Sequence, residues 1–320
     1  MPAVADGAGS SWECEDVSNN DRATTDTADL IEALTYLSDV HIFPRNLALN
    51  SWLKNFSSDE HSVALELASA LLYLSDDEFK KSLNSGVKSA IASIVFGQPM
   101  SGRVSGAWEA ARRNTLFSTP TDGSDDPTNS GNMCLRYLKQ MGIPEKSVLV
   151  GGLRRRVEDT PTPIELILVD DLTASGNQFC KFWGMKQVRG DTSGVSFADL
   201  LADGKIGRAI YVPVLATDVA LERIEAECPG IEVMPVNILS REYMIAADEC
   251  TLIRQPALQK VRNLATKYAP AVQSNHGDFG YGELGLTLSF EHGTPNNTVP
   301  ILGHNRDHSM SQTWHYLLEN

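Results

Sequence analysis

Ile164-Glu-Leu-Ile-Leu-Val-Asp-Asp-Leu-Thr-Ala-Ser-Gly-Asn-Gln178 is an apolar run that ends in two adjacent acids, followed by small residues around a glycine. Leu166 to Val169 has the length and β-branched content of a fully buried parallel strand. Open α/β sheets bind ligands at the carboxyl ends of such strands, so we expect Asp170 and Asp171 to stand at that edge. Thr173 to Gln178 should form a tight turn into a helix, whose free N–H groups would bind an anion.

The composition describes a globular chain that is long enough to bury a large core. Of its 320 residues, 42% are hydrophobic and 21% are charged, and the net charge is −14. Phosphate neutralisation requires clustered Lys and Arg, so this charge argues against broad non-specific nucleic-acid binding. Length alone allows one large domain or two modest ones.

Cysteine usage and hydropathy favour the cytoplasm. The five cysteines are odd in number and show no short paired spacing, so neither a disulfide framework nor a zinc site is indicated. The longest apolar runs are far below the roughly 18 residues of a membrane span, and we expect no such segment. Residues 1–20 are polar and acidic rather than a signal peptide, and we interpret residues 1–22 as a disordered lead-in.

Residues 23–114 are predicted to form a helical N-terminal region. Apolar residues recur at helical spacing in Thr27–Leu37 and in Asp59–Leu74, which predicts two helices. Ser75-Asp-Asp-Glu78 is a capping box that would open a third helix. Apolar stripes of this kind usually pack a core, so we expect no binding site from this region alone.

From residue 115 the pattern changes to short apolar runs that alternate with helical stretches. This alternation predicts an α/β domain over residues 115–320, with a mostly parallel twisted sheet and helices on both faces. Strands are expected at residues 115–118, 147–151, 166–169, 209–215 and 231–238, and helices at 133–141, 179–182, 219–228 and 257–268. Long loops are expected at Pro120–Gly131, which is rich in turn formers, and at Gly152–Pro161.

The opening stretch resembles the phosphoribosyl-pyrophosphate loop of the type I phosphoribosyltransferases. The matching positions are Leu166–Val169, Asp170, Asp171, Leu172, Ala174, Ser175 and Gly176. Thr173 stands where that family usually has an aliphatic residue, and Gln178 where it has Thr or Ser. The strand–turn–helix context and the alternation beyond it agree with the motif. The resemblance therefore implies a phosphoribosyltransferase-like domain over residues 115–320, with a C-terminal extension.

The resemblance implies that this loop binds phosphoribosyl pyrophosphate or a nucleotide. Asp170 and Asp171 would hold the ribose 2′- and 3′-hydroxyls and, with them, a hydrated Mg²⁺. Backbone N–H groups and small side chains would surround a phosphate. The candidate binding residues are Asp170, Asp171, Thr173, Ala174, Ser175, Gly176, Asn177 and Gln178, together with Ser130 and Gly131 of the loop that corresponds in order to the family's pyrophosphate loop.

Positive charge for the pyrophosphate is expected from Arg154, Arg155 and Arg156. They precede the motif strand, where the family places its mobile catalytic loop, and guanidinium groups suit phosphate oxygens. In the alternative interpretation, these arginines form a solvated basic turn that compensates surface acids.

No residue of the motif is an obvious general base. Purine-type members carry an acid at the position of Ala174, so a proton relay cannot operate from that site. Histidine is the natural base near neutral pH, and four histidines gather towards the C-terminus: His276, His292, His304 and His308. Their spacings match no metal motif. His292, with Asn296 and Asn297, would reach a ribose or a base if this segment folds back across the sheet edge; otherwise each histidine is a hydrogen-bonded or surface residue.

The segment Glu291–Leu302 is similar to the end of a bacterial subgroup of phosphoribosyltransferase-like proteins encoded near defence and conflict systems. In that subgroup an aromatic residue usually follows Pro-Ile-Leu, where this chain has Gly303. Two functions stay open. The protein transfers a phosphoribosyl group to an unknown acceptor, or it is a non-enzymatic nucleotide sensor or effector that retains the pocket, as Ala174 and Gln178 suggest. A protein partner or a homo-oligomer is compatible with both, whereas a dinucleotide-binding fold is disfavoured because no Gly-x-Gly-x-x-Gly follows a strand.

Overall fold

The computed structural model describes residues 27–45, 47–97, 104–120, 131–189, 192–272, 275–303 and 314–318. The expected lead-in over residues 1–22, Ser130, His304 and His308 lie outside these ranges. In the described ranges, no helix is both long and apolar enough to cross a membrane.

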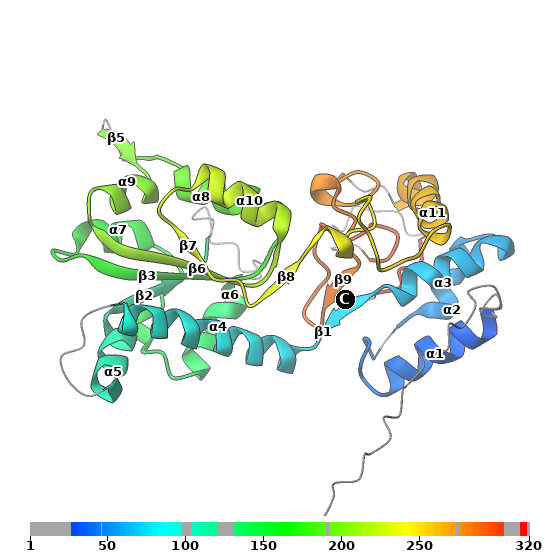
Figure 1. Cartoon of the computed structure of the whole chain (residues 1–320), viewed down its shortest axis with the longest axis horizontal. Coiled ribbons are helices and arrows are strands. Elements are labelled where there is room, and N and C mark those ends of the chain that lie inside the picture. The colour runs from blue at the N-terminus through cyan, green and yellow to red at the C-terminus, as the bar shows by residue number, and fades with distance from the viewer. Residues whose placement is uncertain are drawn as a thin grey trace, which may run out of the picture.

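A five-stranded parallel sheet organises the chain (Figure 1). The strand order is β2-β3-β6-β7, and β8 also pairs with β6. The strands are β2 (Thr115–Ser118), β3 (Ile164–Thr173), β6 (Ile206–Thr217), β7 (Glu232–Val233) and β8 (Asn237–Leu239). The strand expected at residues 231–238 is therefore two short strands, interrupted around Pro235, which has no N–H to donate to the ladder.

Helices cover both faces of this sheet, as predicted. Side chains alternate along β3, so Ile167 and Val169 face one core while Leu166 and Leu168 face another. On the first face lie α4 (Asp76–Phe96), α5 (Val104–Asn114) and α6 (Gly131–Gln140); on the second lie α7 (Leu153–Asp159), α8 (Asn177–Gly184), α9 (Phe197–Ala202) and α10 (Asp218–Glu227) (Figure 1). The predicted α/β class is confirmed.

The predicted capping box opens α4. The Glu78 backbone N–H donates to the Ser75 hydroxyl oxygen at 3.3 Å, and the Ser75 backbone N–H donates to a Glu78 carboxylate oxygen at 3.0 Å. The preceding helix prediction was wrong at its end. Helix α3 (His61–Ser69) stops early, and β1 (Leu72–Leu74) forms a parallel pair with β9 (Leu288–Phe290). A partner that comes from the far end of the chain leaves no local signal.

Two expectations around the sheet also change. The segment 147–151 makes only an isolated bridge between Val148 and Phe117, and no regular strand. The expected Gly152–Pro161 loop contains α7, which begins after Gly152 in the left-handed conformation at φ 67°. Glycine adopts this conformation without steric cost, so it can start a helix directly after a turn.

The N-terminal helices and the C-terminal extension share a second core (Figure 1). It joins α1 (Thr27–Asp39), α2 (Leu49–Trp52) and α3 to α11 (Ala257–Val272) and to residues 299–302. The indole N–H of Trp52, a fully buried residue, donates to the Ile301 carbonyl at 2.6 Å. The C-terminal extension also lies beside the carboxyl edge of the sheet, because Tyr281 and Asn296 line the same cavity as the loop after β3.

The remaining short elements connect these layers. They are the antiparallel pair β4 (Gln187–Arg189) and β5 (Thr192–Val195), and the 3₁₀ turns η1 (Leu53–Asn55), η2 (Ser58–Glu60), η3 (Glu145–Ser147), η4 (Arg241–Tyr243) and η5 (Tyr281–Glu283).

Candidate functional site

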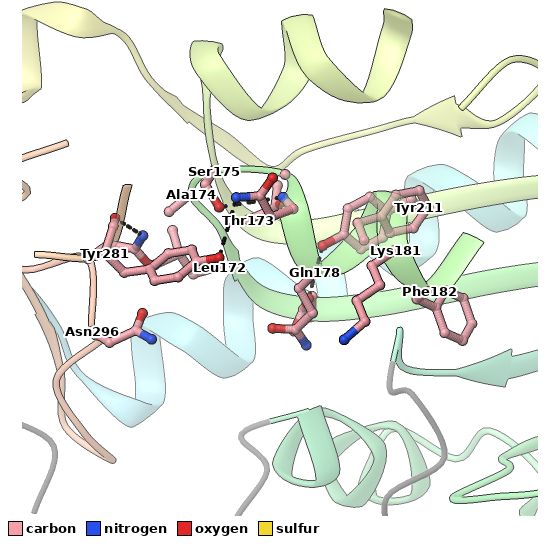
Figure 2. A pocket seen from close by; sticks show the side chains of 15 residues that line it. Leu172, Thr173, Ala174, Ser175, Gln178, Lys181, Phe182, Tyr211, Tyr281 and Asn296 are labelled. Atoms are coloured by element: carbon pink, nitrogen blue, oxygen red, sulfur yellow. Dashed lines mark hydrogen bonds between the residues drawn. The ribbon is translucent and has the colours of Figure 1, made fainter. Parts of the chain in front are cut away.

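A cavity of about 420 Å³ lies where β3 passes into α8 (Figure 2). This volume falls within the roughly 300–1,000 Å³ of small-molecule pockets. Its lining residues are Asp170, Leu172, Thr173, Ala174, Ser175, Gly176, Asn177, Gln178, Phe179, Lys181, Phe182, Tyr211, Tyr281, Asn296 and Asn297. The structure thus gathers Asp170 and the whole predicted loop from Thr173 to Gln178 around one cavity.

The two acids lie inside β3 rather than after it. Pairing with β6 continues to Thr173, whereas pairing with β2 ends where Ser118 meets Leu168. Asp170 and Asp171 are therefore past the end of β2 and still beside β6. The sheet edge expected at the two acids therefore exists only on the β2 side of β3, because β2 is much shorter than β6.

Asp170 is a buried residue of the cavity lining. One of its carboxylate oxygens accepts a hydrogen bond from the Tyr211 hydroxyl at 2.9 Å, and the other accepts from the Asp171 backbone N–H at 3.1 Å. Burial, and then the neighbouring Asp171 carboxylate, raise the pKa of Asp170 well above its ordinary value. Hydroxyl donors or a cation beside this carboxyl group would stabilise its ionised form and offset the cost of its desolvation.

Asp171 faces away from the cavity lining, towards His292. Its Oδ2 lies 3.8 Å from His292 Nε2, and its Oδ1 accepts from the Leu172 backbone N–H at 2.8 Å. The Nδ1 of His292 lies 3.5 Å from Asp76 Oδ1 at the start of α4. Neither imidazole nitrogen makes a hydrogen bond to any part of the chain that the structure describes. The histidine therefore stands between two carboxylates.

Aromatic packing fixes the His292 ring. It stacks on Phe290 with 4.9 Å between ring centroids, and it meets the edge of Phe79 at 5.1 Å. His276 lies elsewhere, with its ring 5.6 Å from that of Tyr281. Of the four histidines singled out from the sequence, His292 is the one placed beside a motif acid within the described residues.

The loop turns sharply at Gly176. Its φ is +73°, and a Cβ atom there would lie 3.1 Å from the Ala220 carbonyl oxygen. Within the described ranges, the backbone N–H groups of Ser175, Gly176 and Gln178 make no hydrogen bond, whereas that of Asn177 donates to Ser175 Oγ at 3.4 Å. Free N–H groups at the start of an eight-residue helix form an anion site, because the helix dipole places partial positive charge there.

Thr217, at the end of β6, and Arg223, within α10, hold this loop. The Arg223 guanidinium donates to the Ser175 carbonyl at 3.0 Å and also to the Asn177 side-chain oxygen. The Thr217 hydroxyl donates to the Ala174 carbonyl. Sequence reasoning missed both residues, because nothing in their spacing relates them to a loop some 40 positions earlier.

The C-terminal extension forms the opposite wall (Figure 2). The Tyr281 backbone N–H donates to the Asn296 carbonyl, and the Asn297 side-chain amide donates to the Tyr281 carbonyl, both at 2.7 Å. The Asn177 amide donates to the Tyr281 hydroxyl at 3.4 Å and so joins the two walls. This segment therefore folds back across the sheet edge, and the Asn296 side chain projects into the cavity.

The arginines proposed for pyrophosphate lie outside the cavity lining. Arg154 is buried, with its guanidinium carbon 4.6 Å above the Phe197 ring and one N–H group donating to the Met185 carbonyl at 3.0 Å. Arg155 is exposed and pairs with Asp159 at 3.4 Å. Gly131 is the first residue of α6 and does not line the cavity either. The roles assigned to these residues stay predictions, and the cation that the structure does place in the lining is Lys181.

The carboxylates of Asp170 and Asp171 are ligands of the kind that Mg²⁺ takes, but of the two only Asp170 lies in the cavity lining. In the described ranges, no group of three or more His, Cys, Asp or Glu side chains is arranged to hold a metal. Mg²⁺ commonly takes one or two carboxylates and completes its shell with waters and substrate oxygens. The pair is therefore suited to such an ion only when a ligand supplies further oxygens.

A parallel sheet with helices on both faces, an acid pair and a glycine turn into a helix define a phosphoribosyltransferase-like protein. Residues 49–320 match the model of the PRTase-CE family, and the chain belongs to that family. Comparisons with curated proteins and with solved structures found no match.

Proposed function

We propose that the protein binds phosphoribosyl pyrophosphate, or a related ribose 5-phosphate ligand, together with Mg²⁺, and transfers the phosphoribosyl group to an acceptor. One observation carries this proposal: backbone N–H groups at the start of α8, which make no hydrogen bond to the described residues, lie in the same cavity as the Asp170 carboxyl group. The N–H groups suit a phosphate and the Asp170 carboxyl group suits ribose hydroxyls. The two groups lie at the two ends of one short loop.

Each part of the ligand has a partner in this arrangement. The 5′-phosphate would accept hydrogen bonds from the N–H groups of Ser175, Gly176 and Gln178. The ribose hydroxyls would donate to Asp170, which lines the cavity, while the neighbouring Asp171 would add negative charge beside it. The raised pKa of Asp170 favours a ligand that offsets its burial. A bound Mg²⁺ would supply positive charge next to the leaving group.

The reaction proposed for this site is a substitution at the anomeric carbon with inversion. The bond from C1 to the diphosphate oxygen breaks, and the diphosphate leaves with the bonding electrons. A bond from C1 to the acceptor forms on the opposite face, and the acceptor proton passes to water or to a base. Electrostatic stabilisation of the cationic ribose and of the departing diphosphate would supply most of the rate enhancement.

Isothermal titration calorimetry tests the binding step. We expect Mg²⁺-dependent heat with phosphoribosyl pyrophosphate, and its loss in the double variant Asp170→Asn with Asp171→Asn. Asp203→Asn, at the exposed end of α9, serves as a control acid variant outside the cavity. Absence of Mg²⁺-dependent heat in the unmodified protein, or unchanged heat in the double variant, would refute the proposal.

The alternative is a non-enzymatic sensor or effector that keeps the pocket. It is favoured by Ala174, which is buried and contributes no acid at the position where purine-type relatives carry one. Incubation with phosphoribosyl pyrophosphate and a panel of bases, followed by measurement of released diphosphate, separates the two functions. Robust turnover would exclude the sensor, whereas tight binding without turnover on any base would favour it.

A further inference from the structure

We propose that Lys181 binds the diphosphate group of the ligand and so supplies the positive charge that the arginines before β3 were expected to supply. This inference rests on the proposed function and names the residue that recognises the second anionic group. It follows from the place of Lys181 on α8, from its direction, and from the charges around the cavity.

Lys181 stands one turn beyond the phosphate-binding end of α8. A helix rises about 1.5 Å per residue, so its Cα lies about 6 Å along the axis from that of Asn177. Residues three apart share a helix face, and Gln178 and Lys181 both line the cavity. An extended lysine at this distance reaches a second anionic group of the same small ligand without competing for the first.

The direction of Lys181 matches the expected diphosphate side. Figure 2 shows the Gln178 and Lys181 side chains projecting from α8 in the same direction. The Gln178 amide donates to the Pro120 carbonyl at 3.3 Å, just after the end of β2. Lys181 therefore points to the side of α8 on which β2 ends, where a second anionic group of a ligand held at the start of the helix can lie.

Charge makes Lys181 the best candidate among the lining residues. It is the single Lys or Arg in the cavity lining, and its side chain is exposed with no ion pair to any described residue. Lys186, by contrast, lies beyond the C-terminal end of α8 and pairs with Asp199 at 3.7 Å. A diphosphate needs a cation at close range, and an ammonium group serves as a point charge for phosphate oxygens.

Calorimetry with three probes tests the proposal: ribose 5-phosphate, inorganic diphosphate and phosphoribosyl pyrophosphate, each with Mg²⁺. Lys181→Ala should weaken binding of diphosphate and of phosphoribosyl pyrophosphate about tenfold or more, as expected for a lost charge-assisted contact. Its affinity for ribose 5-phosphate should stay within about twofold of the unmodified protein. Lys181→Arg should restore most of the loss, and Lys186→Ala should bind all three probes normally.

Two outcomes overturn the role of Lys181. In one, Lys181→Ala binds phosphoribosyl pyrophosphate as tightly as the unmodified protein; in the other, it loses ribose 5-phosphate to the same extent, which would indicate damage to the loop. Failure of the proposed function looks different. The unmodified protein then binds neither ribose 5-phosphate nor phosphoribosyl pyrophosphate, and the proposal falls with it.

Discussion

His292 places its Nε2 atom 3.8 Å from Asp171 Oδ2, and its Nδ1 atom 3.5 Å from Asp76 Oδ1. One imidazole from the C-terminal extension thus joins the acid pair of β3 to the first turn of α4. The Tyr137 hydroxyl donates to the other oxygen of Asp76 at 3.2 Å, so this contact continues to α6. We interpret His292 as a positioning residue that orients the Asp171 carboxylate.

A variant that lacks the two His292 ring nitrogens should lose ligand affinity but keep most of its stability against unfolding. His292→Phe keeps a ring that stacks on Phe290 but removes both nitrogen atoms next to the carboxylates. We expect about tenfold weaker binding of phosphoribosyl pyrophosphate, because Asp171 loses its orienting partner. Calorimetry and thermal unfolding measure the two effects.

His315→Ala is the matched control, since that side chain is exposed and its backbone N–H pairs with Asn55 rather than with a motif acid. It should change neither quantity. Unaltered affinity in His292→Phe would show that the imidazole only fills space.

Gly176→Ala should disable the loop. The left-handed φ costs a residue with a Cβ atom about 1 kcal/mol, and this Cβ atom would also press on the Ala220 backbone at 3.1 Å. We expect a loss of roughly 1–3 kcal/mol in the free energy of unfolding and no measurable binding of ribose 5-phosphate. Urea unfolding and calorimetry provide the readouts.

Gly184→Ala, at the far end of the same helix, would meet no atom within 4 Å. It should leave binding and stability nearly unchanged. Equal behaviour of the two variants would contradict the proposed role of the turn.

Arg223→Ala should loosen the loop between β3 and α8 without unfolding the protein. The guanidinium donates to the Ser175 carbonyl, just before α8, and to the side-chain oxygen of Asn177, the first residue of α8. We expect affinity for ribose 5-phosphate to fall about three- to tenfold, because the two lost hydrogen bonds position the loop and do not contact the ligand. Titration calorimetry gives the ratio.

The control removes another partner of the same arginine. Glu227→Ala deletes the carboxylate that lies 3.4 Å from Arg223 Nε and leaves the contacts to the loop in place. Its affinity should match that of the unmodified protein. A similar loss in both variants would mean that the arginine acts through general charge and not through the loop.

Protonation of Glu60 should lower the stability of the folded protein at acidic pH. Burial acts to raise the pKa of its carboxyl group, but hydrogen bonds from Lys267, Ser57 and Tyr268 outweigh it and lower the pKa from 4.5 to about 2. The folded state thus holds this proton less tightly than the unfolded state does. The stabilisation is fully present above pH 4.5 and is lost as the pH falls towards 2.

Thermal unfolding at several pH values measures this effect. The stability difference between the unmodified protein and Glu60→Gln should be largest at neutral pH and should shrink through that acidic window. Lys267→Gln, which removes the first of the hydrogen-bond donors, should reduce the effect. A difference that is independent of pH would contradict the prediction.

Much of the fold could be predicted because its signals are local. The Ser75–Glu78 capping box, the apolar run of β3 and the turn at Gly176 each act within a few residues, so propensity and pattern reveal them. The same holds for the cavity's first wall. The residues from Thr173 to Gln178 are consecutive, and one strand–turn–helix unit brings them together.

Long-range partners explain what could not be predicted. Residues 72–74 read as the end of a helix, yet they pair with 288–290 as strands because tertiary pairing overrides a short apolar pattern. The role predicted for Arg154 stays untested, but nothing in the sequence indicated that its guanidinium would pack on the Phe197 ring. Neither the pattern nor the charge of a residue says which distant surface will cover it.

The sequence by itself therefore determined the class of fold, the acid pair and the turn at Gly176, since these depend on hydrophobic periodicity and backbone conformation. Only the tertiary structure decided that Arg223 holds the loop, that His292 faces Asp171 and that Asn296 closes the cavity. Those contacts arise because packing of the C-terminal extension, and of α10 beside α8, brings together residues that lie far apart in the chain.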